Sequence, residues 1–428
     1  MLPRRKVEDD MTSINDTLDT PSSDGGKQAV MMPVVGVGVC AGSLRSLETM
    51  FASVGPSLNA AFLIAVRQQE GLDVGSVVDV LSRQSPLPIS IARDGEPIET
   101  DHIYVGGPDD LVAIEEGRLR VRAAEEPVGH RGTIDTMLIS LAEHAQDKAV
   151  AVLLGGLGSD GTAGVTATKK FGGLSIGEAN TQEDENDDQG VAGPYGVVDV
   201  HLPAERIGTQ IALYLNNLET TAPPLEQEEV PEEVEAQVTQ ITTILRNVTS
   251  HDFHGYKRGT FLRRVHRRLQ VLQLETSDAY IARLRNDRQE VQNLFQDLLI
   301  GVTQFFRDPQ EFDVVERELP RLFENKAPDD QFRVWVLGCA TGEEAYSLAI
   351  LLREQMANMA QPPQVQIFAT DLDARALGLA RAGRYSMAIE SQVRRDRLDR
   401  WFVREGDTYC VSKAVSYTHL TLPTNREV

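Results

Sequence analysis

The 428-residue sequence is poor in cysteine, in tryptophan and in long apolar runs. Its three cysteines, Cys40, Cys339 and Cys410, lie too far apart in the chain to indicate a disulfide framework or a metal site. No apolar run approaches the roughly 18 residues that a membrane span needs, and no apolar core follows the basic residues 4–6. We therefore expect no membrane insertion, no secretory signal, no bound metal and a cytoplasmic location.

Basic residues are also scarce, with 42 Lys and Arg against 64 Asp and Glu and a net charge of −22. This balance argues against a general nucleic-acid binder. The charge is uneven, because residues 257–268 are strongly basic and residues 219–235 are rich in glutamate without a basic residue. A basic patch in an acidic protein indicates a local acidic partner, although a solvated surface segment explains either run as well.

The first half of the chain predicts a doubly wound α/β domain. Residues 1–30 are polar and rich in Asp, Ser, Thr and Gly, which predicts a disordered tail. Apolar runs at residues 34–38, 61–66 and 149–154 predict buried strands. Because helical stretches separate these runs, we expect a parallel sheet with helices on its faces over residues 31–216.

The second half predicts a helical domain and a second α/β region. Residues 217–235 form an acidic linker, part of whose end has helical character. Apolar residues at helical spacing predict an all-α domain over residues 236–313. Strands at residues 332–337 and 365–369 then open an incomplete Rossmann-like domain over residues 314–415.

A glycine turn carries the first chemical signal. The strand before Gly338 runs into the turn 338–342, and a helix is expected from Glu343. A strand, a glycine turn and a helix let a nucleotide-like ligand approach the backbone, and Asp371 at the end of the next strand can accept both hydroxyls of a ribose. Alone, this pattern also fits a tight turn in any α/β domain.

Three motifs extend that signal. Residues 338–347 (GCATGEEAYS), 303–308 (TQFFRD) and 251–258 (HDFHGYKR) occur in an order and a spacing that resemble the chemotaxis receptor methyltransferases, the CheR family. The resemblance implies S-adenosylmethionine as cofactor. It implies methyl esterification of receptor glutamates in bacterial chemosensory signalling.

The resemblance also assigns individual residues. Thr303 and Arg307 match positions that contact the cofactor, with Arg307 pairing with its carboxylate through a bidentate fork. Gly338 belongs to the cofactor turn, Glu343 matches a cofactor-binding glutamate suited to an ammonium group, and Asp371 matches the ribose carboxylate. The transfer itself needs positioning of two reactants, with neither a metal nor a protein nucleophile.

Four arginines would recognise the substrate. Arg263, Arg264, Arg267 and Arg268 match the basic face that docks the acidic methylation helix of a receptor, and their spacing suits one face of a helix. The expected partner is therefore a methyl-accepting chemoreceptor or a related signalling protein. A solvated basic helix is the simpler alternative.

The resemblance ends at about residue 415. The family continues with an inserted small sheet and further strands, none of which is expected here, and residues 416–428 do not match. We interpret these last residues as a foreign tail on a truncated reading frame. A sheet of two strands would leave apolar faces uncovered, so we expect a poor or inactive methyltransferase.

Residues 33–216 resemble the catalytic domain of chemotaxis receptor methylesterases, the CheB family. The matching segments are 35–44 (VGVGVCAGSL), 94–97 with 102–105, and 156–161 (GLGSDG). That family uses a Ser-His-Asp triad. The serine position here holds Cys40, the histidine position holds Arg67, and Asp160 is retained.

These replacements predict a dead esterase. An arginine side chain stays protonated and cannot act as a general base, so we expect Arg67 to pair with Asp160. A thiolate activity of Cys40 that uses His130 is the alternative. A further alternative is that residues 36–42 form a loose dinucleotide fingerprint and that Arg67 binds the 2′-phosphate of a nicotinamide cofactor.

The sequence thus predicts S-adenosylmethionine-dependent methylation of receptor glutamates, fused to a methylesterase-like domain with a degenerate triad. A non-catalytic module that binds a receptor or regulates the transferase is the second interpretation. A gene fragment without a stable role is the third.

Overall fold

The computed structural model describes residues 32–421 apart from residues 68–73, 109, 124–131, 156–159, 180–197, 221–231, 302, 325, 406–407 and 417–419. Several sequence predictions fall outside these described residues. They concern the disorder of residues 1–30, the role of His130 and most of residues 416–428. Within the described residues, no helix is both long and apolar enough to cross a membrane.

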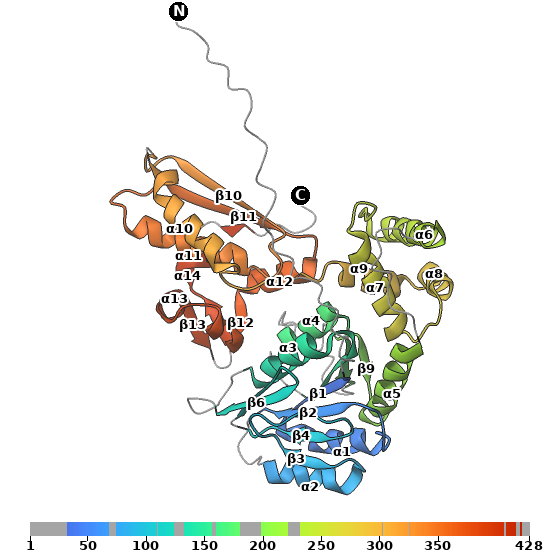
Figure 1. Cartoon of the computed structure of the whole chain (residues 1–428). Coiled ribbons are helices and arrows are strands. Elements are labelled where there is room, and N and C mark those ends of the chain that lie inside the picture. Colours follow the sequence, from blue (N-terminus) through green and yellow to red (C-terminus); the bar gives the residue numbers. More distant parts are fainter. Residues whose placement is uncertain are drawn as a thin grey trace, which may run out of the picture. The chain divides into compact units, whose positions relative to one another are not determined.

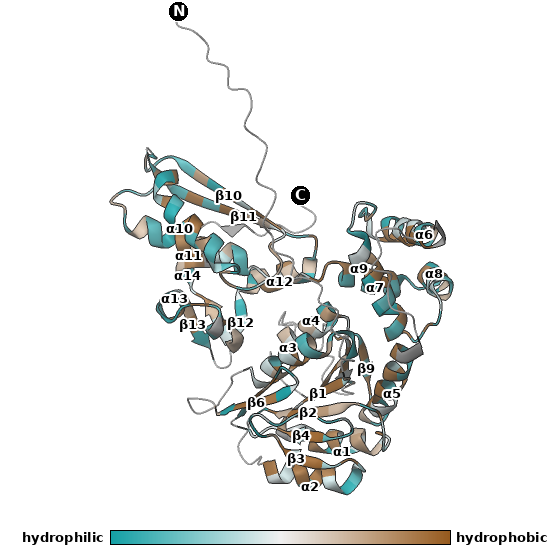
Figure 2. Cartoon of the chain, in the orientation of Figure 1, coloured by the Kyte–Doolittle hydropathy of each residue, from teal (hydrophilic) through white to brown (hydrophobic). Residues whose placement is uncertain are grey.

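The N-terminal α/β domain, residues 32–220, is built on a seven-stranded parallel sheet (Figure 1). The sheet contains the three strands that the sequence predicts, and its order is β3 (Ile89–Ile91), β4 (Ile103–Val105), β2 (Ala61–Val66), β1 (Val34–Val39), β7 (Ala149–Leu154), β8 (Leu174–Glu178) and β9 (Val200–Leu202). Every residue of β1, β2 and β7 is buried, and Figure 2 shows how apolar β1 and β2 are. Continuous apolar strands of this kind are typical of a parallel sheet covered on both faces.

Helices cover both faces of this sheet. Alternate residues of β1 contact a core with α1 (Leu44–Ala52), α2 (Val74–Gln84) and α5 (Ala204–Thr220). The opposite face packs on α3 (Thr133–Ala145) and α4 (Thr162–Phe171). A hairpin of β5 (Asp110–Glu115) and β6 (Arg118–Ala123) adds to that second core. The predicted doubly wound architecture is therefore confirmed.

The predicted linker 217–235 is partly helical. Helix α5 continues to Thr220, and α6 (Glu232–Thr249) already begins at Glu232. Only residues 221–231 separate the two helices, and they lie outside the described residues. The glutamate-rich run did not show where α5 ends or where α6 begins, because glutamate is compatible with an exposed helix.

The helical domain, residues 232–301, contains α6, α7 (Arg258–Val271), α8 (Ser277–Asn286) and α9 (Arg288–Leu298). Their apolar faces form one core that includes Leu245, Phe261 and Leu294. Local capping sets the starts of two helices. Thr276 accepts a hydrogen bond from the amide of Ala279, and Asp287 accepts bonds from the amides of Gln289 and Glu290.

The C-terminal α/β domain, residues 303–421, starts with α10 (Pro309–Phe323) and β10 (Gln331–Leu337). Helix α11 (Glu343–Ala357) leads to β11 (Gln364–Thr370), which pairs in parallel with β10 as predicted. Two residues of β15 (Leu420–Thr421) extend the sheet beyond β11, so part of the expected foreign tail forms a strand. One face is open, since Trp335 and Leu337 are 64% and 67% exposed.

A small antiparallel sheet follows α12 (Ala374–Ala382), which corrects the expectation that no such sheet is present. Its order is β12 (Arg384–Ser386), β14 (Thr408–Val411) and β13 (Phe402–Glu405), with α13 (Arg395–Trp401) before β13 and α14 (Lys413–Ser416) after β14. These strands have three or four residues each, too few for an alternating pattern to be recognised in the sequence.

Candidate active site

The glycine turn after β10 keeps its backbone open on one side. Gly338, Ala340 and Gly342 have positive φ angles of 69°, 46° and 98°. A Cβ atom placed on Gly338 would meet nothing within 4 Å, so a ligand can approach the main chain there. A Cβ atom on Gly342 would lie 2.9 Å from that of Ala380, so close packing of α11 on α12 requires glycine at this position.

Asp371 directly follows β11 and forms a hydrogen bond with this turn. Its carboxylate accepts a hydrogen bond from the amide of Ala340 at 2.8 Å and another from the amide of Asp373 at 2.8 Å. Asp373 in turn caps α12. The half-buried Asp371 side chain therefore stands beside the turn, where a ribose carboxylate is expected.

Glu343 is a buried acid at the first position of α11. Its side chain accepts bonds from the Thr341 hydroxyl at 2.8 and 2.6 Å and is also bonded to Thr303. Burial raises the pKa of Glu343, and these hydrogen bonds only partly offset that effect. A cationic ligand group beside this carboxylate would supply the charge partner that burial makes favourable.

The segment 303–308 is held against α11 by main-chain bonds and aromatic packing. The amide of Phe306 donates to the Ser347 hydroxyl at 3.0 Å, and that hydroxyl donates to the Glu343 carbonyl at 2.7 Å. The ring of Phe305 lies edge-on to that of Tyr385, with their centroids 4.8 Å apart. This anchoring leaves the neighbouring Arg307 side chain 55% exposed.

All five predicted cofactor residues lie on the wall of one cleft: Thr303, Arg307, Gly338, Glu343 and Asp371. The donor set suits S-adenosylmethionine. A guanidinium matches a carboxylate, a buried carboxylate matches an ammonium, and a second carboxylate matches a ribose diol. The open backbone at Gly338 adds the close approach that such a ligand needs.

Sequence reasoning missed two side chains that position this cleft. The hydroxyl of Tyr385 donates to the carbonyl of Thr341 at 2.8 Å, which fixes the turn from the small antiparallel sheet. Ser347 links the segment 303–308 to α11. Ser347 belongs to the motif 338–347, but its role depends on a partner 41 residues away that the motif does not name.

The three esterase positions follow neighbouring parallel strands of the N-terminal α/β domain. Val39 pairs with Val66 and with Leu154, so Cys40 and Arg67 follow adjacent strands at the same edge. The Cys40 sulfur contacts the Ser43 hydroxyl at 3.0 Å. The backbone amide of Arg67 donates to the carbonyl of Val39 at 2.8 Å.

Asp160 caps a helix. Its carboxylate accepts hydrogen bonds from the amides of Ile134 and Asp135 at the start of α3, at 3.3 and 3.0 Å. The fully buried Asp135 does the converse and accepts bonds from Gly161 and Gly164 at the start of α4, at 3.0 and 2.8 Å. Burial and the charge of Asp160 raise the pKa of Asp135 to about 8. The expected pairing of Asp160 with Arg67 stays a prediction.

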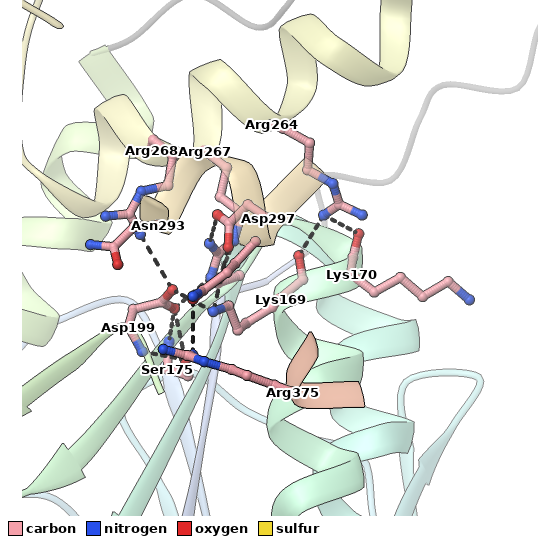
Figure 3. A network of polar contacts seen from close by, with 12 residues as sticks. Lys169, Lys170, Ser175, Asp199, Arg264, Arg267, Arg268, Asn293, Asp297 and Arg375 are labelled. Carbon is pink, nitrogen blue, oxygen red and sulfur yellow. Dashed lines mark hydrogen bonds and ion pairs between the residues drawn. The ribbon is translucent and has the colours of Figure 1, made fainter. Parts of the chain in front are cut away.

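Helix α7 does not present the predicted basic face to solvent. Arg264, Arg267 and Arg268 are buried, and only Arg263 is exposed. Arg264 donates to the main-chain carbonyls of Lys169 and Lys170, and Arg267 donates to Gly173 and to Asp199, all in the N-terminal α/β domain (Figure 3). In this structure three of the four arginines are therefore not available to a receptor helix.

Family models match three consecutive segments of the chain. Residues 35–211 match the CheB methylesterase domain. Residues 236–299 match the all-alpha domain of CheR methyltransferase, and residues 301–419 match its SAM-binding domain. The last match extends a few residues beyond the point where the motif resemblance was expected to end.

Individual proteins agree with these matches. The "uncharacterized 104.1 kDa protein in hypE 3'region" of Rhodobacter capsulatus is 30% identical over 365 residues, which are 80% of this chain and 38% of the relative. A "putative methyltransferase Cher3" of Pseudomonas putida is 36% identical over 32% of this chain and 48% of its own length. A "protein-glutamate methylesterase/protein-glutamine glutaminase" of Geobacillus kaustophilus is 33% identical over 42% of this chain and 52% of its own length.

The chain thus spans between 38% and 52% of the length of these curated relatives. Among solved structures, the Thermotoga maritima CheB methylesterase catalytic domain is similar, with 24% identity, a TM-score of 0.35, and coverage of 42% of this chain and 97% of that one. The chain consists of a CheB methylesterase-type domain followed by the all-α and S-adenosylmethionine-binding domains of the CheR methyltransferase family.

Proposed function

We propose that this protein binds S-adenosylmethionine in the cleft beside the turn 338–342 and methylates glutamate side chains of chemoreceptors or related signalling proteins. The supporting observation is that Thr303, Arg307, Gly338, Glu343 and Asp371, selected from motif resemblance alone, lie on one cleft. The matched SAM-binding domain supports the same assignment.

The chain's own residues would orient the cofactor. Arg307 and Glu343 would hold opposite charges of an amino-acid group, and Asp371 would accept the ribose hydroxyls. When bound, S-adenosylmethionine would supply an electrophilic methyl group: a glutamate carboxylate oxygen would form a bond to the methyl carbon as its bond to sulfur breaks, leaving S-adenosylhomocysteine. The buried rings of Phe305 and Tyr385 stiffen the segment that carries Thr303 and Arg307, which keeps the cleft in one geometry.

We infer that the N-terminal α/β domain is a poor methylesterase. Cys40 has a hydroxyl neighbour in Ser43, and the position expected to hold the general base holds Arg67. Asp160 is engaged by two main-chain amides. A regulatory role for this domain, without ester hydrolysis, is the second candidate function, and its contact with α7 favours that role.

Calorimetry of S-adenosylmethionine binding tests the proposal. Glu343→Gln keeps the shape of the side chain and removes its charge, so we expect affinity to fall about 10- to 100-fold, the range typical of a charge-assisted hydrogen bond. Glu318→Gln on the exposed face of α10 makes the same chemical change away from the cleft and should bind like the unmodified protein. Absence of saturable binding by the unmodified chain would refute the assignment.

A further inference from the structure

A buried charge cluster joins α7 and α9 to the N-terminal α/β domain. We use the name α7 charge cluster for Lys169, Asp199, Arg267, Arg268, Glu290 and Asp297. Figure 3 shows most of its members converging between the end of α4, the start of β9 and the two helices. The cluster holds three cations and three carboxylates, so its charges balance.

Arg267 lies at the centre of the cluster and is 1% exposed. Its guanidinium contacts Asp199 at 2.5 Å in one domain and Asp297 at 2.5 Å in the other. Burial disfavours its charge, but the two carboxylates outweigh that effect and raise the pKa of Arg267. A basic residue on a docking face is ordinarily exposed to solvent. Arg267 is instead a buried cation whose charge is balanced by one carboxylate from each domain.

Arginines of α7 also cap α4 from outside. The carbonyls of Lys169 and Lys170 lie in the last turn of α4 and that of Gly173 follows it, at the end of the helix that carries a partial negative charge. Arg264 donates to the first two carbonyls at 2.8 and 3.2 Å, and Arg267 donates to the third at 2.9 Å. The hydrogen-bond acceptors of Arg264 thus lie in the N-terminal α/β domain, so separation of the domains would leave its guanidinium open to an acidic partner.

Apolar contact supports the polar one. Val271 at the end of α7 is 4% exposed and belongs to the core of the N-terminal α/β domain together with Ile211 and Tyr214 of α5. The contact therefore has the apolar centre and the charged groups of a built interface.

The cluster is not completely satisfied. One carboxylate oxygen of Asp199 and one of Asp297 have no hydrogen bond among the described residues, and both face the Lys169 ammonium at 3.4 Å. A buried network with incomplete hydrogen bonding stabilises a contact weakly for its size, because desolvation offsets much of the attraction. Such a contact fixes one arrangement and still allows an acidic partner to compete.

We propose that the N-terminal α/β domain occupies the basic face of α7 and so inhibits docking of glutamate-bearing helices to the transferase half. This inference rests on the proposed function, since it concerns the substrate of that transferase. Asp199 and the carbonyls at the C-terminal end of α4 act as an internal substitute for the carboxylates of the substrate helix. A partner that binds α7 must first displace them.

Lys169→Glu in the full chain tests this. The substitution places a third negative charge beside Asp199 and Asp297, and the side chain is 14% exposed, at the end of a helix. Lys170→Glu is the matched control, because it makes the same change one residue later. The Lys170 ammonium lies over the Phe171 ring at 4.8 Å and points away from the cluster in Figure 3.

The probe is a fluorescent, amphipathic helical peptide with glutamates three and four residues apart. We expect Lys169→Glu to raise the radius of gyration in small-angle X-ray scattering and to increase peptide affinity about tenfold or more over the unmodified chain and over Lys170→Glu. Arg264→Ala added to Lys169→Glu should remove that gain. A larger radius with unchanged affinity would overturn the proposal, as would an unchanged radius.

A second measurement does not depend on any variant. Saturating peptide must itself increase the radius of gyration of the unmodified chain, because coupling between two binding equilibria is reciprocal. Peptide that binds with no change in radius would contradict the inhibition. Calorimetry of S-adenosylmethionine on the same samples separates the two proposals, since loss of cofactor binding refutes the proposed function and leaves the peptide result readable.

Discussion

Among single residues, Asp135 is a carboxyl group whose pKa the fold raises into the neutral range. Its pKa rises from an ordinary value of 3.8 to about 8, because the side chain is buried beside Asp160. The folded chain therefore binds this proton more tightly than the unfolded chain does. The contribution of Asp135 to the free energy of unfolding is greatest below about pH 4 and is lost as the pH rises towards 8.

Asp135→Asn should remove this pH dependence. The amide oxygen can still accept the bonds from Gly161 and Gly164, and the amide nitrogen takes the place of Asp135 Oδ2, which has no hydrogen-bond partner among the described residues. Urea denaturation at about pH 5 and about pH 8.5 should show a smaller difference between the two conditions for the variant than for the unmodified protein. Equal differences would mean that Asp135 does not titrate in this window.

At the scale of secondary-structure elements, α7 and α9 are joined by an ion pair within the helical domain. Glu290 accepts two bonds from the Arg268 guanidinium, at 2.9 and 2.6 Å, and a third from the Tyr280 hydroxyl at 2.9 Å. All three side chains are buried. Each helix thus depends on the other for the neutralisation of a buried charge.

Glu290→Gln should lower the free energy of unfolding by about 3–5 kcal/mol, because it leaves Arg268 with an incompletely compensated buried charge. Glu318→Gln breaks an exposed pair with Arg321 on α10 and should cost less than about 1 kcal/mol. Guanidinium denaturation of the two variants measures this difference. A similar loss in both would show that burial adds little to the Arg268 pair.

The elements also show what the sequence could and could not predict. Strands such as β1, β2, β7 and β10 were predictable, because a short run of apolar and often β-branched residues between helical stretches is typical of a buried strand. The cleft residues were predictable because they belong to short motifs with fixed spacing. The burial of Arg267 was not predictable, since its partner Asp199 lies 68 residues away in a segment with no local signal.

At the scale of the whole molecule, the C-terminal sheet leaves an apolar face open. β10 is an edge strand of its sheet, and Trp335 and Leu337 on it are 64% and 67% exposed. The Trp335 indole donates only to the Thr370 hydroxyl on the neighbouring strand, at 3.1 Å, among the described contacts. Exposed edges with large apolar side chains promote self-association.

Replacing both side chains with lysine, Trp335→Lys and Leu337→Lys, should reduce concentration-dependent aggregation. Charged residues on an edge strand oppose pairing with a second chain, and neither side chain is part of a buried core. Static light scattering over a concentration series is the measurement. The double change Leu322→Lys and Val403→Lys, at exposed positions of α10 and β13, adds the same two charges elsewhere, and an equal effect there would assign the change to net charge alone.

The α7 charge cluster has a consequence for how such chains are recombined. A fusion of two independent modules tolerates exchange of either one, whereas here Arg264 and Arg267 find their acceptors in the other module. A chimaera that received a foreign N-terminal module would have to bring its own counterparts of Asp199 and Lys169. We therefore expect that substitutions at this contact in one half are accompanied in evolution by compensating substitutions in the other half.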